Sequence, residues 1–549
     1  MTSKPVTKSE PPPERRSPAD PAATRTPIVP IPEVPEAATR VDAPEDPRHV
    51  EGEPRGTGGG VSDPFPPFRW PSERPAPERE RLPRIVSPSP ARRLRLGVAA
   101  AGVVLATAIY LVPSPEGLAV EGKAAFAVFV ACIALWITNA LPIGVTGLLA
   151  VALLAVTGGL EPAEAYAAFG NSAVFFILGV FIFAAGIIQS GLSKRMALAF
   201  LQRFQRGPYT LAAGMMLTAA FLTVWMPAQA TAAMLFPITV EIARAAKLEK
   251  GSSPYGRVLF LSAAWGAMIG SNASMLGSAR APLALGLLEE GFGTTIGFDA
   301  WIAASGPVVV LGLIVGLLVL RFAYRTEAVE LGAARSVIAE GVAALGSMGP
   351  RQARVAIVTA ATIAAWILLG GVIDRAAVAL LAAVAMFAVG VLRWNDLEGY
   401  VQWGIVLMYG GAIAVGVAID RTGAAEWLVS GLLDGVRLPP YVAIAGLALL
   451  MVALSEVMSN AAAVAVLLPL AFTLTGPLGL TPTAMVLTTC IGAGLAFTLP
   501  ISSAPNTLAY SSGYVGMRDM MLVGSVMTAV QISILMLVAW LYWPMLGLI

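Results

Sequence analysis

The sequence predicts an all-α polytopic membrane protein with about 11 transmembrane helices and two re-entrant hairpins, arranged in inverted repeats. Three observations support this fold class. The chain of 549 residues is 56% hydrophobic and 13% charged, with a mean hydropathy of +0.74, which is far too apolar for a soluble protein of this length. Several apolar stretches are long enough to cross a bilayer. The second half of the chain repeats landmarks of the first half at a constant spacing.

Residues 1–95 differ from the rest of the chain in composition. Residues 1–96 contain 16 of the 36 Lys and Arg residues and 14 of the 34 Asp and Glu residues. Residues 1–90 contain 22 of the 41 prolines. A segment with so few bulky apolar residues cannot bury enough surface to offset its chain entropy. We therefore expect a disordered, Pro-rich cytoplasmic tail, which ends in Arg92, Arg93 and Arg95 directly before the first apolar run.

Histidine and cysteine are too scarce in the apolar body for the usual catalytic or zinc sites. His49 lies in the tail, and Cys132 and Cys490 each lie inside an apolar run. Zinc sites and Ser-His or Cys-His catalysis need clusters of these residues. We therefore expect that the protein is not an enzyme, that it has no cofactor, and that it binds no metal beyond sodium.

Candidate spans fill the chain after the tail. Residues 96–119 hold an extra first transmembrane helix, whose apolar span is at about 97–113. The other uninterrupted spans lie at about 123–139, 142–158, 172–190, 300–322, 352–371, 373–391, 401–420 and 520–547. Interrupted spans lie at about 255–290 and 481–514. Two further stretches, 209–247 and 438–473, are too long for one crossing and are broken by polar or small residues. We interpret each as a re-entrant hairpin of two half-helices.

The loop charges predict the orientation of these spans. Arg92, Arg93 and Arg95 place the N-terminus in the cytoplasm, because basic residues are enriched in cytoplasmic loops. The basic residues of 194–206, 244–257 and 321–354 then also fall inside, whereas Glu161 and Glu164 fall outside. Eleven spans give an external C-terminus, and we expect a multi-pass protein of the cell (inner) membrane.

An internal repeat organises the membrane body. One constant shift along the chain places Gly179 on Gly411, Gly191 on Gly423, Met226 on Met458, Pro237 on Pro469 and Ser271 on Ser503. The first repeat covers 120–325, a cytoplasmic linker covers 326–351, and the second repeat covers 352–549. Each unit has five full spans, an odd number, so the second unit must be inverted in the membrane. Inverted repeats around broken helices are typical of secondary transporters.

Polar side chains gather where the helices break. A half-helix N-terminus presents unpaired N–H groups to an anion, and carbonyl and hydroxyl oxygens at a break can coordinate a small cation. The candidate substrate-binding residues are Gln229, Thr231, Arg280, Ser459, Asn460, Ser503 and Asn506, and the candidate cation ligands are Ser271, Asn272, Ser274, Ser459, Asn460 and Ser502. Alternatively, they are caps and small packing residues of ordinary spans. Clusters at four repeat-matched breaks favour a binding site.

Arg280 is an unusual residue inside an apolar stretch, six positions after Ser274. An arginine at membrane depth is costly and usually faces a cavity. Its guanidinium could clamp a carboxylate or a sulfate. The alternatives are that it extends to the membrane interface or forms a structural ion pair with Glu456, a residue that we expect to stabilise the second hairpin.

The membrane body resembles the divalent anion:sodium symporter family of di- and tricarboxylate and sulfate transporters, over about residues 120–549. The resemblance rests on Trp136 to Pro142, with Asn139 where the family usually has Glu, and on Trp225 to Pro237, Glu456 to Pro469 and Ser503 to Asn506. It implies a homodimer in which a fixed scaffold domain carries a moving elevator domain. It also implies that the hairpin tips bind sodium and substrate carboxylates.

The two tips match the family's Ser-Asn-Thr motif unequally. The second keeps Ser459 and Asn460 but has Ala461 in place of Thr, whereas the first has Pro227, Ala228 and Gln229. We predict a transporter of small divalent anions in the lipid bilayer, coupled to sodium or protons, or an exchanger. An arsenite permease or a sodium/proton antiporter of the same architecture is the alternative, and we expect no nucleic-acid partner.

Overall fold

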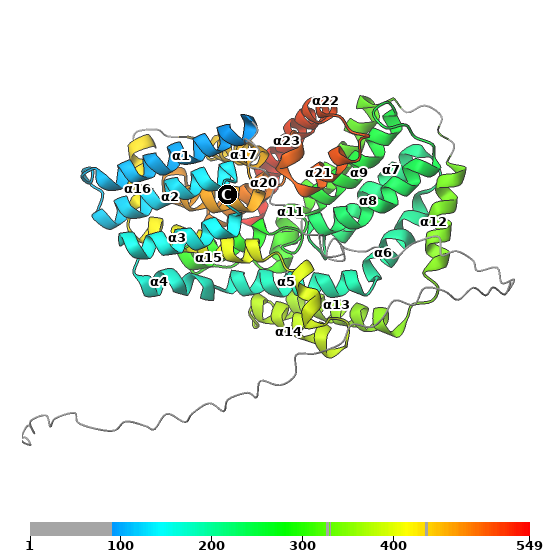
Figure 1. The fold of residues 1–549 in the computed structure, drawn as a ribbon, viewed down its shortest axis with the longest axis horizontal. Coiled ribbons are helices and arrows are strands. Elements are labelled where there is room, and N and C mark those ends of the chain that lie inside the picture. Colours follow the sequence, from blue (N-terminus) through cyan, green and yellow to red (C-terminus); the bar gives the residue numbers. More distant parts are fainter. Residues whose placement is uncertain (1–89, 326–328, 330, 434–437) are drawn as a thin grey trace, which may run out of the picture. The chain divides into compact units, whose positions relative to one another are not determined.

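The computed structural model describes residues 90–325, 329, 331–433 and 438–549, and these residues form helices joined by short turns without any β-strand (Figure 1). Residues 1–89 of the predicted tail therefore lie outside the described residues. The first helix begins at Pro90, several residues before the predicted start of the first span.

The first half of the chain contains the extra first helix and then the helices of the first repeat, in the predicted order. They are α1 (Pro90–Leu111), α2 (Val120–Thr138), α3 (Ile143–Thr157), α4 (Pro162–Ala167), α5 (Ser172–Gln189), α6 (Leu192–Leu201), α7 (Pro208–Leu222), α8 (Ala228–Ala245), α9 (Pro254–Gly270), α10 (Arg280–Phe292) and α11 (Phe298–Ala323).

The second half follows the same order. It contains α12 (Gly332–Ala344), α13 (Pro350–Leu368), α14 (Arg375–Ala388), α15 (Trp403–Arg421), α16 (Ala424–Leu433), α17 (Pro440–Val457), α18 (Asn460–Thr473), α19 (Thr475–Leu478), α20 (Pro482–Ala493), α21 (Ala504–Ser511), α22 (Met517–Asp519) and α23 (Ser525–Leu541). Each predicted span and each hairpin arm corresponds to at least one of these helices.

The lengths of the helices distinguish complete crossings from partial ones. Within the described residues, eight helical segments are long and apolar enough to cross a membrane. Helix α7 of the first hairpin and the helices of both interrupted spans have 17 residues or fewer, whereas α8 has 18 residues and is not among the eight apolar segments. Helix α17 is long enough to cross alone although we predicted it as a hairpin arm, and α3 and α14, predicted as full spans, have only 15 and 14 residues.

The predicted repeat is visible in the helix boundaries. Helices α3 and α14 begin at Ile143 and Arg375, and α8 and α18 begin at Ala228 and Asn460, so both pairs start at the spacing that the sequence repeat predicts. The spacing then shortens, because the starts of α10 and α21 lie closer together along the chain than these two pairs do. The sequence match of Ser271 with Ser503 is therefore wrong, since the second repeat has fewer residues than the first before and within its broken span.

The two repeats pack against each other through two equivalent pairs of helices, one helix of each pair from each repeat. Helix α3 of the first repeat packs against α15 of the second, and α5 of the first packs against α14 of the second. Helices α7, α8 and α9 also pack together (Figure 1), as α17, α18 and α20 do. Each hairpin therefore lies beside the broken span of its own repeat.

Polar contacts between segments far apart in the sequence show which helix ends lie on the same side of the protein. Arg257 pairs with Asp519 at 3.2 Å, and the sequence places both on the cytoplasmic side. Arg421 pairs with Glu164 at 2.6 Å, and the sequence places both outside. These contacts join ends that the predicted topology puts on one side, while the direction of the whole protein in the membrane stays a prediction.

The predicted linker at 326–351 contains a helix that the sequence analysis missed. Helix α12 packs against α6 and α8, and it buries Ala334, Ile338 and Gly341. These residues are three to four positions apart and form one helical face. Residues 326–328 and 330 of this linker lie outside the described part of the chain.

Candidate functional site

Each hairpin turns at a short non-helical segment inside the protein. In the first, α7 ends at Leu222 and α8 begins after Pro227, whose ring suits the first turn of a helix. In the second, α17 ends at Val457 and α18 begins after Ser459. The hydroxyl oxygen of Ser459 accepts a hydrogen bond from the backbone N–H of Ala462 at 3.3 Å, which is an N-cap contact.

The interrupted spans restart in the same way. After the first break, α10 begins at Arg280, and after the second, α21 begins after Ser503. The Ser503 hydroxyl accepts a hydrogen bond from the backbone N–H of Asn506 at 3.4 Å. Ser459 and Ser503 therefore each cap a helix at a break, so the alternative interpretation as capping residues applies to both, and it does not exclude a role in binding.

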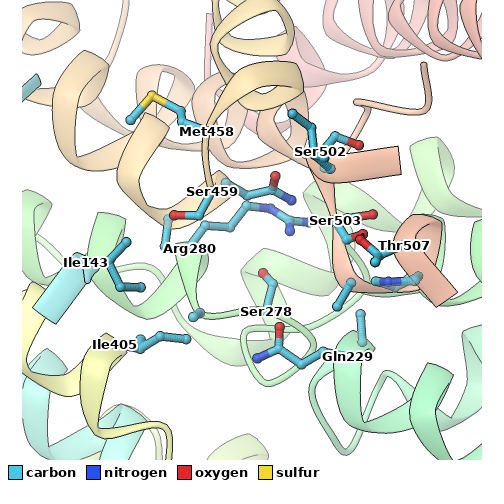
Figure 2. Close-up of a pocket in the computed structure, with 18 of the residues that line it drawn as sticks. Ile143, Gln229, Ser278, Arg280, Ile405, Met458, Ser459, Ser502, Ser503 and Thr507 are labelled. Atoms are coloured by element: carbon cyan, nitrogen blue, oxygen red, sulfur yellow. The ribbon is translucent and has the colours of Figure 1, made fainter. Parts of the chain in front are cut away.

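The starts of these four helices meet at one cavity of about 680 Å³. Its lining includes the N-terminal residues Ala228 of α8, Arg280 of α10, Asn460 of α18 and Ala504 of α21. Figure 2 shows the side chains of Arg280, Ser459, Ser503 and Gln229 around the same hollow. The tertiary structure thus brings together four breaks that are spread over more than half of the sequence.

Most of the predicted substrate-binding residues line this cavity. Gln229, Arg280, Ser459, Asn460 and Ser503 are in the lining. Thr231 and Asn506 are fully buried and are not part of it. The structure therefore places these two side chains behind the wall of the cavity.

The predicted cation ligands divide between the wall and the layer behind it. Ser271, Ser459, Asn460 and Ser502 line the cavity, whereas Asn272 and Ser274 are buried behind it. The Ser274 hydroxyl donates to the carbonyl oxygen of Val224 at 2.8 Å. Ser274 therefore fastens the first break to the first hairpin tip.

Arg280 is buried, with 4% of its surface exposed. Its Nε donates to the carbonyl oxygen of Cys490 at 2.7 Å, and its Nη2 donates to Ser271 Oγ at 3.0 Å and to Asn272 Oδ1 at 2.8 Å. Both structural alternatives for this residue are therefore wrong. The guanidinium does not reach the membrane interface, and its partners do not include Glu456.

Glu456 has partners of its own in the second break. Its two carboxylate oxygens accept hydrogen bonds from the backbone N–H groups of Thr498 and Leu499 at 2.8 and 2.7 Å. Glu456 is the last but one residue of α17, so these bonds tie the second hairpin to the second broken span. The structure agrees with a stabilising role for this carboxylate.

Two amide oxygens, one at the second hairpin tip and one at the second break, are buried without a protein partner. They are Asn460 Oδ1 and Asn506 Oδ1, which make no hydrogen bond within the described residues. The amide nitrogen of Asn506, in contrast, donates to Ser502 Oγ at 3.1 Å. Because a buried polar atom is costly when unpaired, these oxygens are candidate ligands for a cation or a water molecule.

The sequence analysis missed the opposite wall of the cavity. This wall includes Trp136, Thr138 and Asn139 at the turn between α2 and α3, Ile405 of α15 and Arg95 of α1. Asn139 has a left-handed backbone conformation with φ of 50°, which asparagine tolerates better than most residues. The available signal was the family-like segment from Trp136 to Pro142, which we used to recognise the family and did not assign to the site.

The charges of the cavity have one sign. Arg95 and Arg280 line it, and none of its described lining residues is Asp or Glu. Each helix N-terminus adds a partial positive charge. The site can therefore attract and hold an anion, while its hydroxyl and amide oxygens are suited to a hard monovalent cation.

Comparison with known protein families agrees with this geometry. A family model described as "Sodium:sulfate symporter transmembrane region" matches residues 95–549. The chain belongs to this family. The predicted resemblance to the divalent anion:sodium symporters is thereby confirmed, and the chain is a polytopic membrane protein of a transporter family.

Two relatives are similar to this chain over most of its length. The sodium-dependent dicarboxylate transporter SdcS of Staphylococcus saprophyticus is 25% identical over 476 residues, covering 81% of this chain and 91% of the relative. SdcS of Staphylococcus aureus is 24% identical with the same coverage.

Two solved transporter structures share the fold at low sequence identity. They are MtrF of Neisseria gonorrhoeae, associated with a class of antimetabolite efflux pumps, and the YdaH transporter of Alcanivorax borkumensis. MtrF matches with a TM-score of 0.51 and 13% identity over 81% of this chain and 94% of its own. YdaH matches with a TM-score of 0.50 and 14% identity over 83% and 99%.

Proposed function

We propose that this chain is a secondary active transporter of small divalent anions, of the di- or tricarboxylate or sulfate type, coupled to a cation. The observation that carries the proposal is the convergence of four helix N-termini and two arginines on one cavity. Each N-terminus is equivalent to about half a positive charge. Such a concentration of positive charge favours a small solute with more than one negative charge.

The coupling ion that fits the second break is sodium, transported together with the anion. The unpartnered oxygens of Asn460 and Asn506 are the kind of ligand that sodium accepts. Ser502 adds a hydroxyl oxygen nearby, since it is bonded to Asn506. The relatives named above are sodium-dependent dicarboxylate transporters, which supports sodium as the coupling ion.

Alternating access follows from how the cavity is built. One wall belongs to the hairpins and broken spans, and the other belongs to the α2–α3 turn and α15. We assign the first group to a moving elevator domain and the second to a scaffold in a homodimer. Arg95 and Asn139 lie at helix ends that the sequence places in the cytoplasm, so this cavity would be open to that side.

The alternative solutes fit the cavity less well. A sodium/proton antiporter requires an acidic ion ligand in its core, and Glu456 is not part of the described lining and bonds two backbone N–H groups. The two arginines in the lining also favour an anion over a neutral or cationic solute.

Uptake measurements test the proposal directly. Purified protein in proteoliposomes should accumulate labelled succinate, citrate or sulfate when an inward sodium gradient is imposed. Sodium and pH gradients are varied separately, and preloading with unlabelled anion detects exchange. Equal uptake with and without each gradient and each preload would contradict coupled transport.

A further inference from the structure

The guanidinium of Arg280 occupies a pocket made of neutral oxygen atoms. Its acceptors are a hydroxyl oxygen of Ser271, an amide oxygen of Asn272 and the main-chain carbonyl of Cys490, all within 3.0 Å. None of the ion pairs between described residues includes Arg280. A buried positive charge is thus held by dipoles and by no carboxylate.

This set of acceptors has the composition of a cation site. Hydroxyl, amide and main-chain carbonyl oxygens are the groups that coordinate sodium where a transmembrane helix unwinds. Ser271 and Asn272 also follow directly after α9, where the helix C-terminus carries partial negative charge. Both residues were predicted as cation ligands because they lie at a break in the helix. The structure shows an intramolecular cation bound to them.

Space for this cation is provided by a glycine of the other repeat. Gly494 is the residue directly after α20, and a Cβ placed on it would lie 2.4 Å from Nη2 of Arg280 and 2.7 Å from Asn272 Oδ1. Any larger residue at this position would push the guanidinium off its acceptors. The second repeat therefore leaves a place for a side chain that originates in the first.

The equivalent break of the second repeat lacks such a charge. Helix α21, which corresponds to α10, begins with Ala504, Pro505 and Asn506. Instead of a guanidinium, this break has the unpartnered oxygens of Asn506 and of Asn460 in the adjacent tip. At the first break, the oxygen ligands are therefore already bound to the guanidinium of Arg280. At the second break and its adjacent tip, the amide oxygens have no partner within the described residues.

We propose that Arg280 is a resident cation that replaces a transported cation in the first break. The protein then binds a single coupling sodium, in the second break, instead of one in each. This inference rests on the proposed cation-coupled transport. Its consequence is a lower coupling ratio: at zero voltage, a tenfold sodium gradient would support about tenfold accumulation of the anion with one sodium and about a hundredfold with two.

Equilibrium binding of radioactive sodium to the purified full-length protein tests the proposal without requiring transport. The wild type is expected to bind about one sodium per chain, and Asn460→Ala is expected to remove it. Asn272→Ala is expected to leave sodium binding unchanged, because Asn272 already serves the guanidinium. Two sodium ions per wild-type chain, with one lost in Asn272→Ala, would overturn the proposal.

Variants of Arg280 give a second, independent measurement. Arg280→Ala uncovers the oxygens of Ser271, Asn272 and Cys490, so a monodisperse variant should bind about two sodium ions per chain. Arg280→Lys keeps the charge and should still bind about one. A folded Arg280→Ala variant that binds no additional sodium would overturn the proposal. If this variant does not fold, the wild-type and Asn272→Ala counts decide the question.

Transport separates this inference from the proposed function. Succinate accumulation by the wild type should rise about tenfold per tenfold sodium gradient at clamped zero voltage. Sodium binding without any anion uptake would refute the proposed function and leave the count of sites standing. Sodium-driven uptake that rises about a hundredfold would keep the proposed function and refute the resident cation.

Discussion

Gly411 of α15 lies against Gly147 of α3, and a Cβ placed on Gly411 would come within 2.3 Å of the Gly147 Cα. The spacing that relates the two halves of the sequence maps Gly147 onto Ala379 and Gly179 onto Gly411. Gly179 does lie against Ala379, at 2.7 Å from a built Cβ to the main-chain carbon. The two halves therefore exchange equivalent contacts, which is the packing expected of two units related by an approximate two-fold axis.

The close approach of α3 and α15 predicts a stability change. Gly411→Ala should lower the melting temperature of the detergent-solubilised protein, because overpacking a tight contact costs about 1–3 kcal/mol. Gly446→Ala on α17 is the matched control, since nothing lies within 4 Å of a Cβ there and alanine favours helix. Equal melting temperatures of the two variants would contradict the tight packing of these helices.

The second hairpin tip is expected to matter more for transport than the first. Asn460→Ala removes a cavity-lining amide whose buried oxygen has no protein partner, so uptake should be abolished at unchanged protein level. Gln229→Ala, at the first tip, is the comparison and should retain more activity. Wild-type uptake by Asn460→Ala, measured in proteoliposomes, would refute the assignment of the site to this tip.

Glu456 and Arg280 should behave as independent residues. Glu456→Gln leaves one of the N–H groups of Thr498 and Leu499 without an acceptor and gives the other a neutral one, which should cost about 1–3 kcal/mol of stability. In a double-mutant cycle with Arg280→Gln, the coupling free energy should stay below about 0.5 kcal/mol, because the two side chains share no partner. Restoration of stability in the double variant would instead reveal a charge pair.

The orientation can be tested by labelling single cysteines. A cysteine at Glu161 should react with an impermeant maleimide added outside, and one at Arg203 should react only after permeabilisation. The native thiols give little background, because Cys132 and Cys490 are buried. The opposite labelling pattern would reverse the predicted direction of both repeats.

The sequence by itself determined the periodic features of this protein. Apolar length located the spans, because a bilayer-crossing helix needs a continuous run of about 20 apolar residues. The matched spacing of Pro237 and Pro469 located equivalent helices in the two halves, and the breaks near Ser459 and Ser503 identified the candidate site. The apolar runs and the breaks are local properties, each encoded within a few turns of helix, and the repeat is a regularity of the sequence itself.

Contacts between the two halves were decided by the tertiary structure alone. The partners of Arg280 include Cys490, which is 210 residues away, and no local pattern indicates that Gly494 leaves room for its guanidinium. The second broken span is also shorter than the first, which shifts the counterpart of Ser271 in a way that a constant spacing cannot reveal. Such contacts depend on how the repeats pack, and packing couples residues through space whatever their separation along the chain.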